Sequence, residues 1–414
     1  MKLCIITPRL PPAMDGLGDY CHQLYSRLRC IPADASLVGV DIVRFGTGAD
    51  ETATVTAGST DEPDKAQFEF SFLVLDGADA TRKLWNDVQV QAFMPARGDL
   101  KSQLDRIGAT TVILQYVGYG YAPDGAPLYL AKELADWKSA HPEARLFIMF
   151  HETWATGMPW QRVFWQMGAQ RQSVADLLKV CDVAVASVKV NADAMRSIDP
   201  KKDVRTIGIG SSFNADSSAF KNWRRLLIFG KPGSRRRALK NHAQLLKALD
   251  GKNLLDEIVC AGQCDPDQIG DDISTLRSLG VKTQVVTEYN FAGNSIPQSV
   301  QTCGLSIMHT QSTYMLKSTS FQLAAQLGQV AITTEEHSAD APFVADEHFL
   351  CYSKNSMAEV INTIENQSRL CDVAAALNAM YEQCLSWNQI ALSWAKLLLE
   401  AESAGKMISN IRST

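Results

Sequence analysis

Basic side chains gather around one short segment near the middle of the chain. The apolar run 226–229 is followed by Gly230 and Lys231, and then by Arg235, Arg236, Arg237, Lys240 and His242. The whole chain has 40 Lys and Arg against 45 Asp and Glu, a net charge of −5, so this local positive excess is informative. A diphosphate requires converging charges and N–H donors. The pattern predicts a phosphate site with Gly230, Lys231, Arg236 and Lys240; a solvated basic loop is the alternative.

A second candidate phosphate site follows the apolar segment that ends near residue 309. Lys317 stands directly before Ser318 and Thr319, where an Ala-rich helical pattern begins. Backbone N–H groups and hydroxyls at a helix start can hold a phosphate, and Ser312 adds another hydroxyl. An ordinary N-cap is the alternative interpretation.

A histidine ends the most apolar strand pattern of the first half of the chain. His151 follows residues 146–150, which read Leu-Phe-Ile-Met-Phe. Ligands of open α/β sheets bind beyond the carboxyl ends of strands, so His151 is predicted to contact a sugar hydroxyl or a leaving group. A buried structural histidine is the alternative.

Aromatic residues follow His151 closely. They are Trp154, Trp160, Phe164 and Trp165, with Arg162 among them. They suit stacking on sugars or contact with a lipid surface, but we favour packing inside the domain.

A glycine-rich turn follows the first apolar run. Gly16 and Gly18 precede apolar residues at a spacing of four, so the turn opens a helix and permits close approach of a ligand to the backbone. A plain strand-to-helix turn is the alternative. The dinucleotide fingerprint requires a third glycine where Cys21 stands, which disfavours a nicotinamide oxidoreductase.

Composition restricts the remaining classes. Cys260 and Cys264 have no partner pair at zinc-site spacing, and Asp265 and Asp267 have no third ligand nearby, so no metal site is predicted. The net negative charge disfavours general nucleic-acid binding. The sequence shows no secretory signal and no apolar run of about 18 residues, so we expect a cytoplasmic protein, with peripheral membrane contact left open.

Apolar β-branched runs alternate with helical patterns, which is typical of parallel sheets covered by helices on both faces. The expected strands are 2–7, 37–45, 68–75, 111–117, 145–151, 183–187, 225–229, 257–261, 283–287, 304–309 and 330–333. A Gly-, Ser- and Asn-rich stretch at 207–222 predicts a domain boundary. We therefore expect two doubly wound, Rossmann-like domains facing each other across a cleft.

The order of these motifs resembles the retaining nucleotide-sugar glycosyltransferases of the GT-B fold, family four type. The matching segments are Pro11-Pro12-x-x-x-Gly16-x-Gly18-x-Tyr20, His151, Phe229-Gly230-Lys231, Lys240-Asn241-His242 and Ser386-Trp387-Asn388-Gln389-Ile390-Ala391. The resemblance implies an acceptor-side domain at 1–212, a donor-side domain at 213–384 and a C-terminal helix at 385–414 that returns to the first domain.

The same resemblance implies an activity. It is metal-independent transfer of a hexose from a nucleoside-diphosphate sugar, the co-substrate, to a carbohydrate or lipid-linked hydroxyl acceptor in polysaccharide or glycolipid assembly. No cofactor is implied. His151 would contact the transferring sugar, and Lys231 and Lys240 the departing diphosphate.

One departure from the family pattern concerns its paired glutamates. The family has two, eight positions apart, near the helix expected from about residue 318, whereas this chain has no acidic residue between His309 and Thr334. The alternative function is therefore a non-catalytic GT-B-like partner subunit with a vestigial cleft.

Overall fold

The computed structural model describes residues 1–11, 16–31, 68–75, 88–94, 98–213, 215, 217–291, 295–309, 312–334, 342–353 and 355–412. Two compact units divide the chain. Unit 1 comprises Met1–Gly208 and Trp387–Thr414, and unit 2 comprises Ile209–Ser386. The polypeptide therefore leaves unit 1 once and returns to it near its end.

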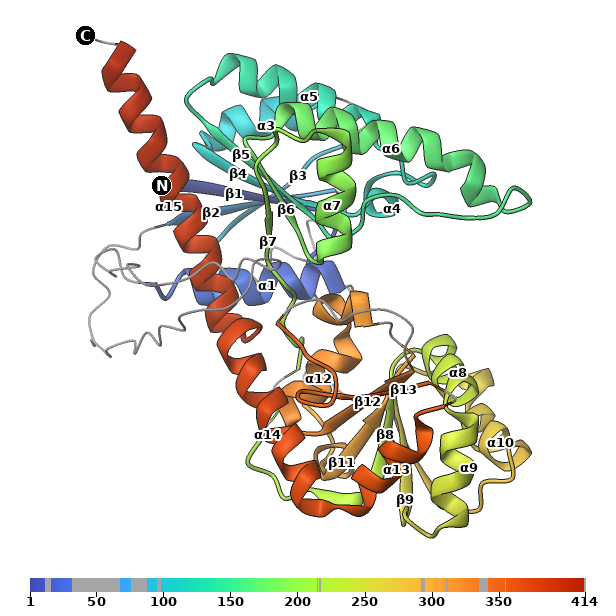
Figure 1. Cartoon of the computed structure of the whole chain (residues 1–414). Coiled ribbons are helices and arrows are strands. Elements are labelled where there is room, and N and C mark those ends of the chain that lie inside the picture. Colours follow the sequence, from blue (N-terminus) through green and yellow to red (C-terminus); the bar gives the residue numbers. More distant parts are fainter. Residues whose placement is uncertain are drawn as a thin grey trace. The chain divides into compact units, whose positions relative to one another are not determined.

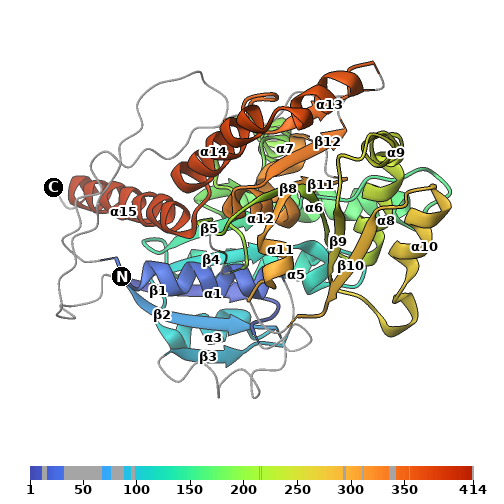
Figure 2. The same cartoon turned by 90° about the horizontal axis from the view of Figure 1, so that it is seen from below.

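The sheet of unit 1 is parallel, and its order β3-β2-β1-β4-β5-β6-β7 can be followed through the first five strands in Figure 2. Its strands are β1 (Lys2–Thr7), β2 (Glu69–Val74), β3 (Gln89–Ala92), β4 (Thr111–Tyr116), β5 (Arg145–Phe150), β6 (Val183–Ala186) and β7 (Val204–Thr206). The order reverses between β1 and β4, which is the topological switch point of a doubly wound sheet.

Helices cover both faces of this sheet (Figure 1). They are α1 (Gly16–Leu28), α3 (Leu100–Ile107), α4 (Gly118–Tyr121), α5 (Leu128–Ala140), α6 (Arg162–Val180), α7 (Lys189–Ile198) and α15 (Trp387–Arg412). Alternate strand residues such as Leu146 and Ile148 pack in one core with Leu134 and Leu177 of α5 and α6. The strand period of two turns Phe147 to the opposite face, where its ring meets Trp394 of α15.

Helix α15 crosses α1 within unit 1 (Figure 1). The buried Trp394 donates from Nε1 to the Tyr20 hydroxyl at 2.8 Å, and Trp387 meets the Tyr20 ring edge-on. Burial raises the pKa of the Tyr20 phenol, so it stays protonated. These contacts fix the first turns of α15 to α1.

The sheet of unit 2 repeats the topology, with parallel order β10-β9-β8-β11-β12-β13. Its strands are β8 (Asn222–Phe229), β9 (Glu257–Gly262), β10 (Gln284–Tyr289), β11 (Cys303–Ile307), β12 (Val330–Thr334) and β13 (Leu350–Tyr352). Its switch point lies between β8 and β11.

The helical segments of unit 2 also divide between the two faces of its sheet. They are α8 (Pro232–Asn241), α9 (Ala243–Gly251), η2 (Pro266–Gln268), α10 (Asp271–Ser278), α11 (Gln298–Gln301), η3 (Ser312–Lys317), α12 (Thr319–Leu327), α13 (Met357–Glu365) and α14 (Gln367–Cys384). Ile228 packs with Leu239 and Leu246 on one face, while Leu227 packs with Leu323 on the other.

The predicted fold class is confirmed, and within the described residues ten of the expected strands are present with ends shifted by a few residues. The strand expected at 37–45 lies outside the described residues. The sequence reading missed β3, β7 and β13, which have only three or four residues and too few apolar positions to show a period.

Candidate functional site

The carboxyl end of β8 lies at the switch point of unit 2 and leads directly into α8. Lys231 occupies the N-cap position, Pro232 the first helical position, and no side chain caps the helix. Ser234 and Arg235 donate their backbone N–H groups to the Lys231 carbonyl. The start of α8 therefore combines an uncapped positive helix end with a lysine, which suits an anion.

Two glycines permit the strand ends to approach each other. Gly230 has φ +143° and Gly262, at the end of β9, has φ +118°. A Cβ added to Gly262 would lie 2.5 Å from the Gly230 carbonyl oxygen. Both positions thus require glycine for their positive φ and for the close approach of neighbouring atoms, whether or not a ligand binds.

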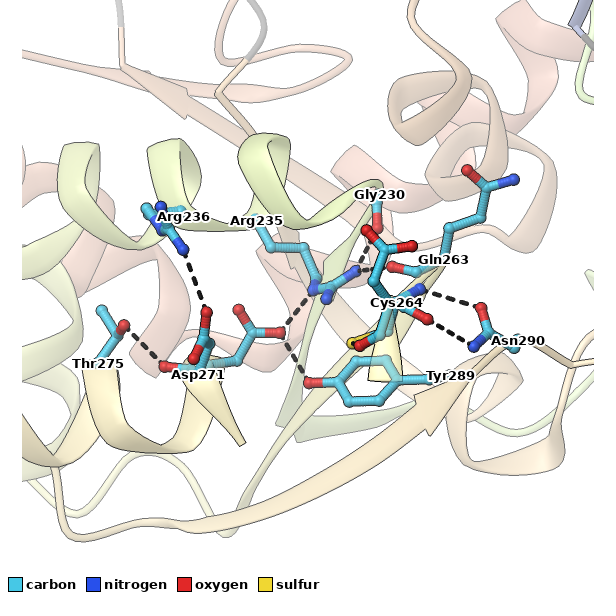
Figure 3. Close-up of polar contacts among 11 residues, drawn as sticks. Gly230, Arg235, Arg236, Gln263, Cys264, Asp271, Thr275, Tyr289 and Asn290 are labelled. Atoms are coloured by element: carbon cyan, nitrogen blue, oxygen red, sulfur yellow. Dashed lines mark hydrogen bonds and ion pairs between the residues drawn. The ribbon is translucent and has the colours of Figure 1, made fainter. Parts of the chain in front are cut away.

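Arg235 is the buried member of the basic cluster. Its Nε donates to Asp272 at 2.6 Å, and its Nη1 donates to the carbonyl oxygens of Gly230 and Gln263 (Figure 3). The guanidinium also lies over the Tyr289 ring, whose hydroxyl donates to Asp272 at 2.7 Å. Its side chain is 1% exposed. Arg235 therefore joins the ends of β8, β9 and β10 to α10 and is not available to a ligand.

The next arginine is paired as well, but in solvent. Arg236 donates to Asp271 at 3.1 Å, and its side chain is 64% exposed. In contrast, Lys231, Arg237 and Lys240 are exposed, and in the described part of the chain no carboxylate forms an ion pair with any of them. The positive charge that no described carboxylate neutralises is therefore spread along α8, from Lys231 at its N-cap through Arg237 to Lys240 in its last turn.

Arg237 connects α8 to the neighbouring strand across the switch point. It approaches Nε2 of His309 at 3.4 Å, and His309 follows β11 by two residues. Burial, and then the charge of Arg237, lower the pKa of His309. His309 therefore has a neutral ring beside Arg237, and an anion bound there would favour its protonation.

His242 fixes the turn that follows Lys240. Its Nε2 is 2.8 Å from the Met308 carbonyl oxygen, and its Nδ1 is 2.8 Å from the Tyr352 hydroxyl. A carbonyl can only accept, so Nε2 carries the proton and Nδ1 accepts from Tyr352. Burial lowers the pKa of His242 to about 4. His242 is a neutral positioning residue that ties the α8–α9 turn to the end of β11.

The second predicted phosphate site has a different local structure. Ser318 caps α12 by accepting from the Phe321 N–H at 3.3 Å. Lys317 lies over the Tyr314 ring at 5.1 Å, and Thr319 is exposed. Ser312 begins η3. This helix start is capped by its own residue, whereas that of α8 is open, so the geometry favours α8 for an anion.

His151 follows β5 as expected and is buried, with 7% exposure. Its Nε2 lies 2.8 Å from Oε1 of Gln115, and its ring meets Tyr20 edge-on. Gln115 is fully buried on β4, and within the described residues its Nε2 has no partner. Sequence reasoning missed Gln115, because a single glutamine inside an apolar run gives no signal.

The glycines of α1 differ in their surroundings. A Cβ at Gly18 would lie 3.2 Å from the Arg9 carbonyl oxygen and from the Leu10 Cα, whereas one at Gly16 would meet nothing within 4 Å. Gly18 therefore permits α1 to pack on the chain that follows β1. Gly16 is exposed, and its predicted role toward a ligand stays a prediction.

The expectation that the aromatic segment packs inside the domain is wrong for two of its members. Trp160 is 79% exposed and Trp165 is 77% exposed. Trp154 does pack against the core of unit 1. Trp160 precedes α6 and Trp165 lies in its first turn, so both are exposed because they come before the buried positions of α6, which begin at Gln170.

The described residues contain no group of three His, Cys, Asp or Glu side chains placed to hold a metal ion. No helix among them is long and apolar enough to cross a bilayer.

Comparison with known proteins shows the fold. No protein-family model matches the chain, and no curated protein matches its sequence significantly. Among solved structures, it is similar to Anabaena Alr3699/HepE in complex with UDP and glucose, with a TM-score of 0.57 and 12% identity over 97% of this chain and 100% of that one.

Two further solved structures are similar to this chain over nearly its whole length. A glycosyltransferase from Rickettsia africae has a TM-score of 0.59 and 10% identity over 97% of this chain and 98% of its own. The lipopolysaccharide outer core galactosyltransferase WaaB has a TM-score of 0.57 and 8% identity over 97% of this chain and 100% of its own. The chain has the GT-B fold of these glycosyltransferases.

Proposed function

We propose that this chain is a glycosyltransferase that moves a hexose from a nucleoside-diphosphate sugar to a hydroxyl acceptor, with retention, in polysaccharide or glycolipid assembly. The observation that carries the proposal is the basic character of α8. No side chain caps its start at Lys231, and within the described residues no carboxylate pairs with Lys231, with Arg237 in the middle of the helix or with Lys240 in its last turn. The GT-B fold supports it, since HepE was solved with UDP.

The chemistry at this site is electrostatic. Glycosyl transfer from such a donor leaves a diphosphate whose charge grows as the glycosidic bond breaks. We propose that Lys231 and Lys240 stabilise that charge, with Arg237, which lies beside His309, as an additional donor. These cations can supply the stabilisation that a metal gives elsewhere, so we propose that transfer is metal-independent and needs no cofactor.

The experiment is a transfer and hydrolysis assay with UDP-, GDP- and ADP-sugars, combined with calorimetric binding of the three nucleoside diphosphates. We expect one nucleotide to bind and its sugar to be released or transferred. Failure of all three nucleotides to bind would contradict the proposal.

A non-catalytic GT-B-like partner subunit is the second candidate. The absence of acidic residues between His309 and Thr334 favours it, since these positions include the start of α12 beside the end of β11. Binding of a nucleoside diphosphate without turnover of any of its sugars, with or without acceptor extracts, would support this candidate.

A further inference from the structure

An exposed aromatic patch lies at the start of α6 in unit 1. Met158, Trp160 and Trp165, which we call the Trp160 patch, are 55%, 79% and 77% exposed. The loop that carries it extends away from the sheet at the tip of α6 (Figure 1). Three large apolar side chains within eight residues are more than the scattered single exposures that any surface shows.

Local hydrogen bonds hold the backbone of this loop and the Trp165 ring in place. Gln161 accepts from the Met158 N–H at 2.9 Å and donates its own N–H to the Met158 carbonyl at 2.8 Å. Trp165 donates from Nε1 to the Pro159 carbonyl at 3.0 Å, and the Phe164 ring meets the Trp165 ring edge-on. The Trp165 indole therefore has its donor satisfied while its hydrocarbon face remains in water.

The charged residue nearest the patch along the chain is Arg162, which lies between Trp160 and Trp165. Residues 153–175 contain one further arginine, Arg171, and the exposed Glu152 and the ion-paired Asp176 lie just outside this segment. Both arginines are exposed, and Arg171 lies over the Trp154 ring at 5.5 Å. Exposed tryptophans beside arginines combine apolar area with attraction to negative charge.

We propose that the Trp160 patch docks unit 1 on the surface of a membrane that contains anionic phospholipids. Trp160, Met158 and the face of Trp165 enter the interfacial region, and Arg162 contacts the phosphates. A carbohydrate fits less well, because the Trp165 N–H is already bonded and Met158 and Pro159 offer no polar group. A second copy of the chain fits less well, because self-contact would bring like-charged arginines together.

The experiment is flotation of the full chain with vesicles of phosphatidylcholine containing 30% phosphatidylglycerol, and with pure phosphatidylcholine. We expect binding to the anionic vesicles that weakens at high salt. The double variant Trp160→Ser with Trp165→Ser should lose at least about tenfold in partitioning, and Arg162→Glu should lose binding to the anionic vesicles selectively.

The matched control is Phe220→Ser, which removes an aromatic ring that is 80% exposed in unit 2. It should bind vesicles like the wild type, and all variants should keep the wild-type melting temperature. No binding by the wild type, equal binding by the double variant, or a patch-dependent dimer or glycan complex without vesicle binding would overturn the proposal. Because the readout is partitioning, it does not depend on the proposed transfer activity.

Discussion

At the scale of single residues, Lys240 offers a test of whether a cation of α8 binds a ligand or is an ordinary surface charge. Lys240→Ala should weaken binding of the cognate nucleoside diphosphate by about 1.5–3 kcal/mol, the range for a hydrogen bond to a charged group. Calorimetry at moderate salt measures this. Lys247→Ala, which removes an exposed lysine from the neighbouring α9, is the control and should bind normally. Equal affinities for both variants would exclude Lys240 from the site.

His151 has both a predicted catalytic role and an observed structural contact. If it contacts the transferring sugar, His151→Ala should lower turnover by about 10²-fold, because the lost interaction belongs to the transition state. Gln115→Leu removes the other half of the buried hydrogen bond and serves as the comparison. It should lower the melting temperature by several degrees while the folded protein keeps turnover within severalfold. Matching losses of stability with unchanged turnover in both variants would assign His151 a structural role alone.

At the scale of elements, α8 gives three consecutive arginines three different environments. Arg235→Met would leave Asp272, which is 4% exposed, without its cationic partner and with only the Tyr289 hydroxyl bonded to it. We expect a loss of about 3–5 kcal/mol in unfolding free energy, as for a broken buried ion pair. Arg236→Met breaks an exposed pair and should cost about 1 kcal/mol or less.

Denaturant unfolding of the two variants measures the difference. A double variant, Arg235→Met with Asp272→Leu, should recover part of the loss, because no unpaired charge then remains buried. Similar stabilities for Arg235→Met and Arg236→Met would contradict the buried network of Figure 3.

This arginine run shows where sequence reasoning reaches its limit. Apolar runs and the glycines after them were enough to predict the strand ends and the switch-point location of the cluster. Successive residues of a helix point about 100° apart, so the phase of α8 decides which arginine is buried. That phase places Arg235 with Ala238 and Leu239 in the core, and no periodic signal in so short and basic a helix shows it. Arg236 was therefore the arginine predicted from the sequence, and its role at the site stays a prediction. In the structure, Arg237 is the arginine that lies beside His309.

The α8–α9 turn gives unit 2 a dependence on pH through His242. Its pKa is about 4 in the folded state against an ordinary value near 6.5, so below that value the unfolded chain binds the proton more readily. The neutral ring of His242 makes its full contribution to the unfolding free energy above about pH 6.5, and this contribution is lost as the pH falls toward 4. Relative to His242→Gln, the wild type should lose about 2 kcal/mol of unfolding free energy between pH 7 and pH 4.5. Urea unfolding of both proteins across this range measures it, and a constant difference would contradict a depressed pKa.

At the scale of the whole molecule, the proposed metal independence can be tested directly. We expect transfer to continue undiminished in excess chelator if, as proposed, Lys231, Lys240 and Arg237 provide the positive charge that stabilises the leaving diphosphate. A loss of activity that manganese or magnesium restores would show that a cation shares this role.

The two-unit fold was predictable because each half repeats alternating strand and helix patterns, and GT-B topology followed from the order of the motifs. The Trp160 patch was not predictable, because aromatic residues in such a segment are equally compatible with a buried core and with an exposed surface. Only the position of Trp160 and Trp165 ahead of the buried turns of α6 distinguishes the two outcomes.

The hydrogen bond between Tyr20 and Trp394 spans 374 residues and sets an order for events during synthesis. Unit 2 is contiguous and can fold once Ser386 has left the ribosome, whereas unit 1 must wait for α15. At 5–20 residues per second, Tyr20 emerges roughly 20–75 s before its partner. During that interval the face of the first sheet around Phe147 lacks its covering helix, so the nascent chain exposes an apolar surface until α15 has been synthesised.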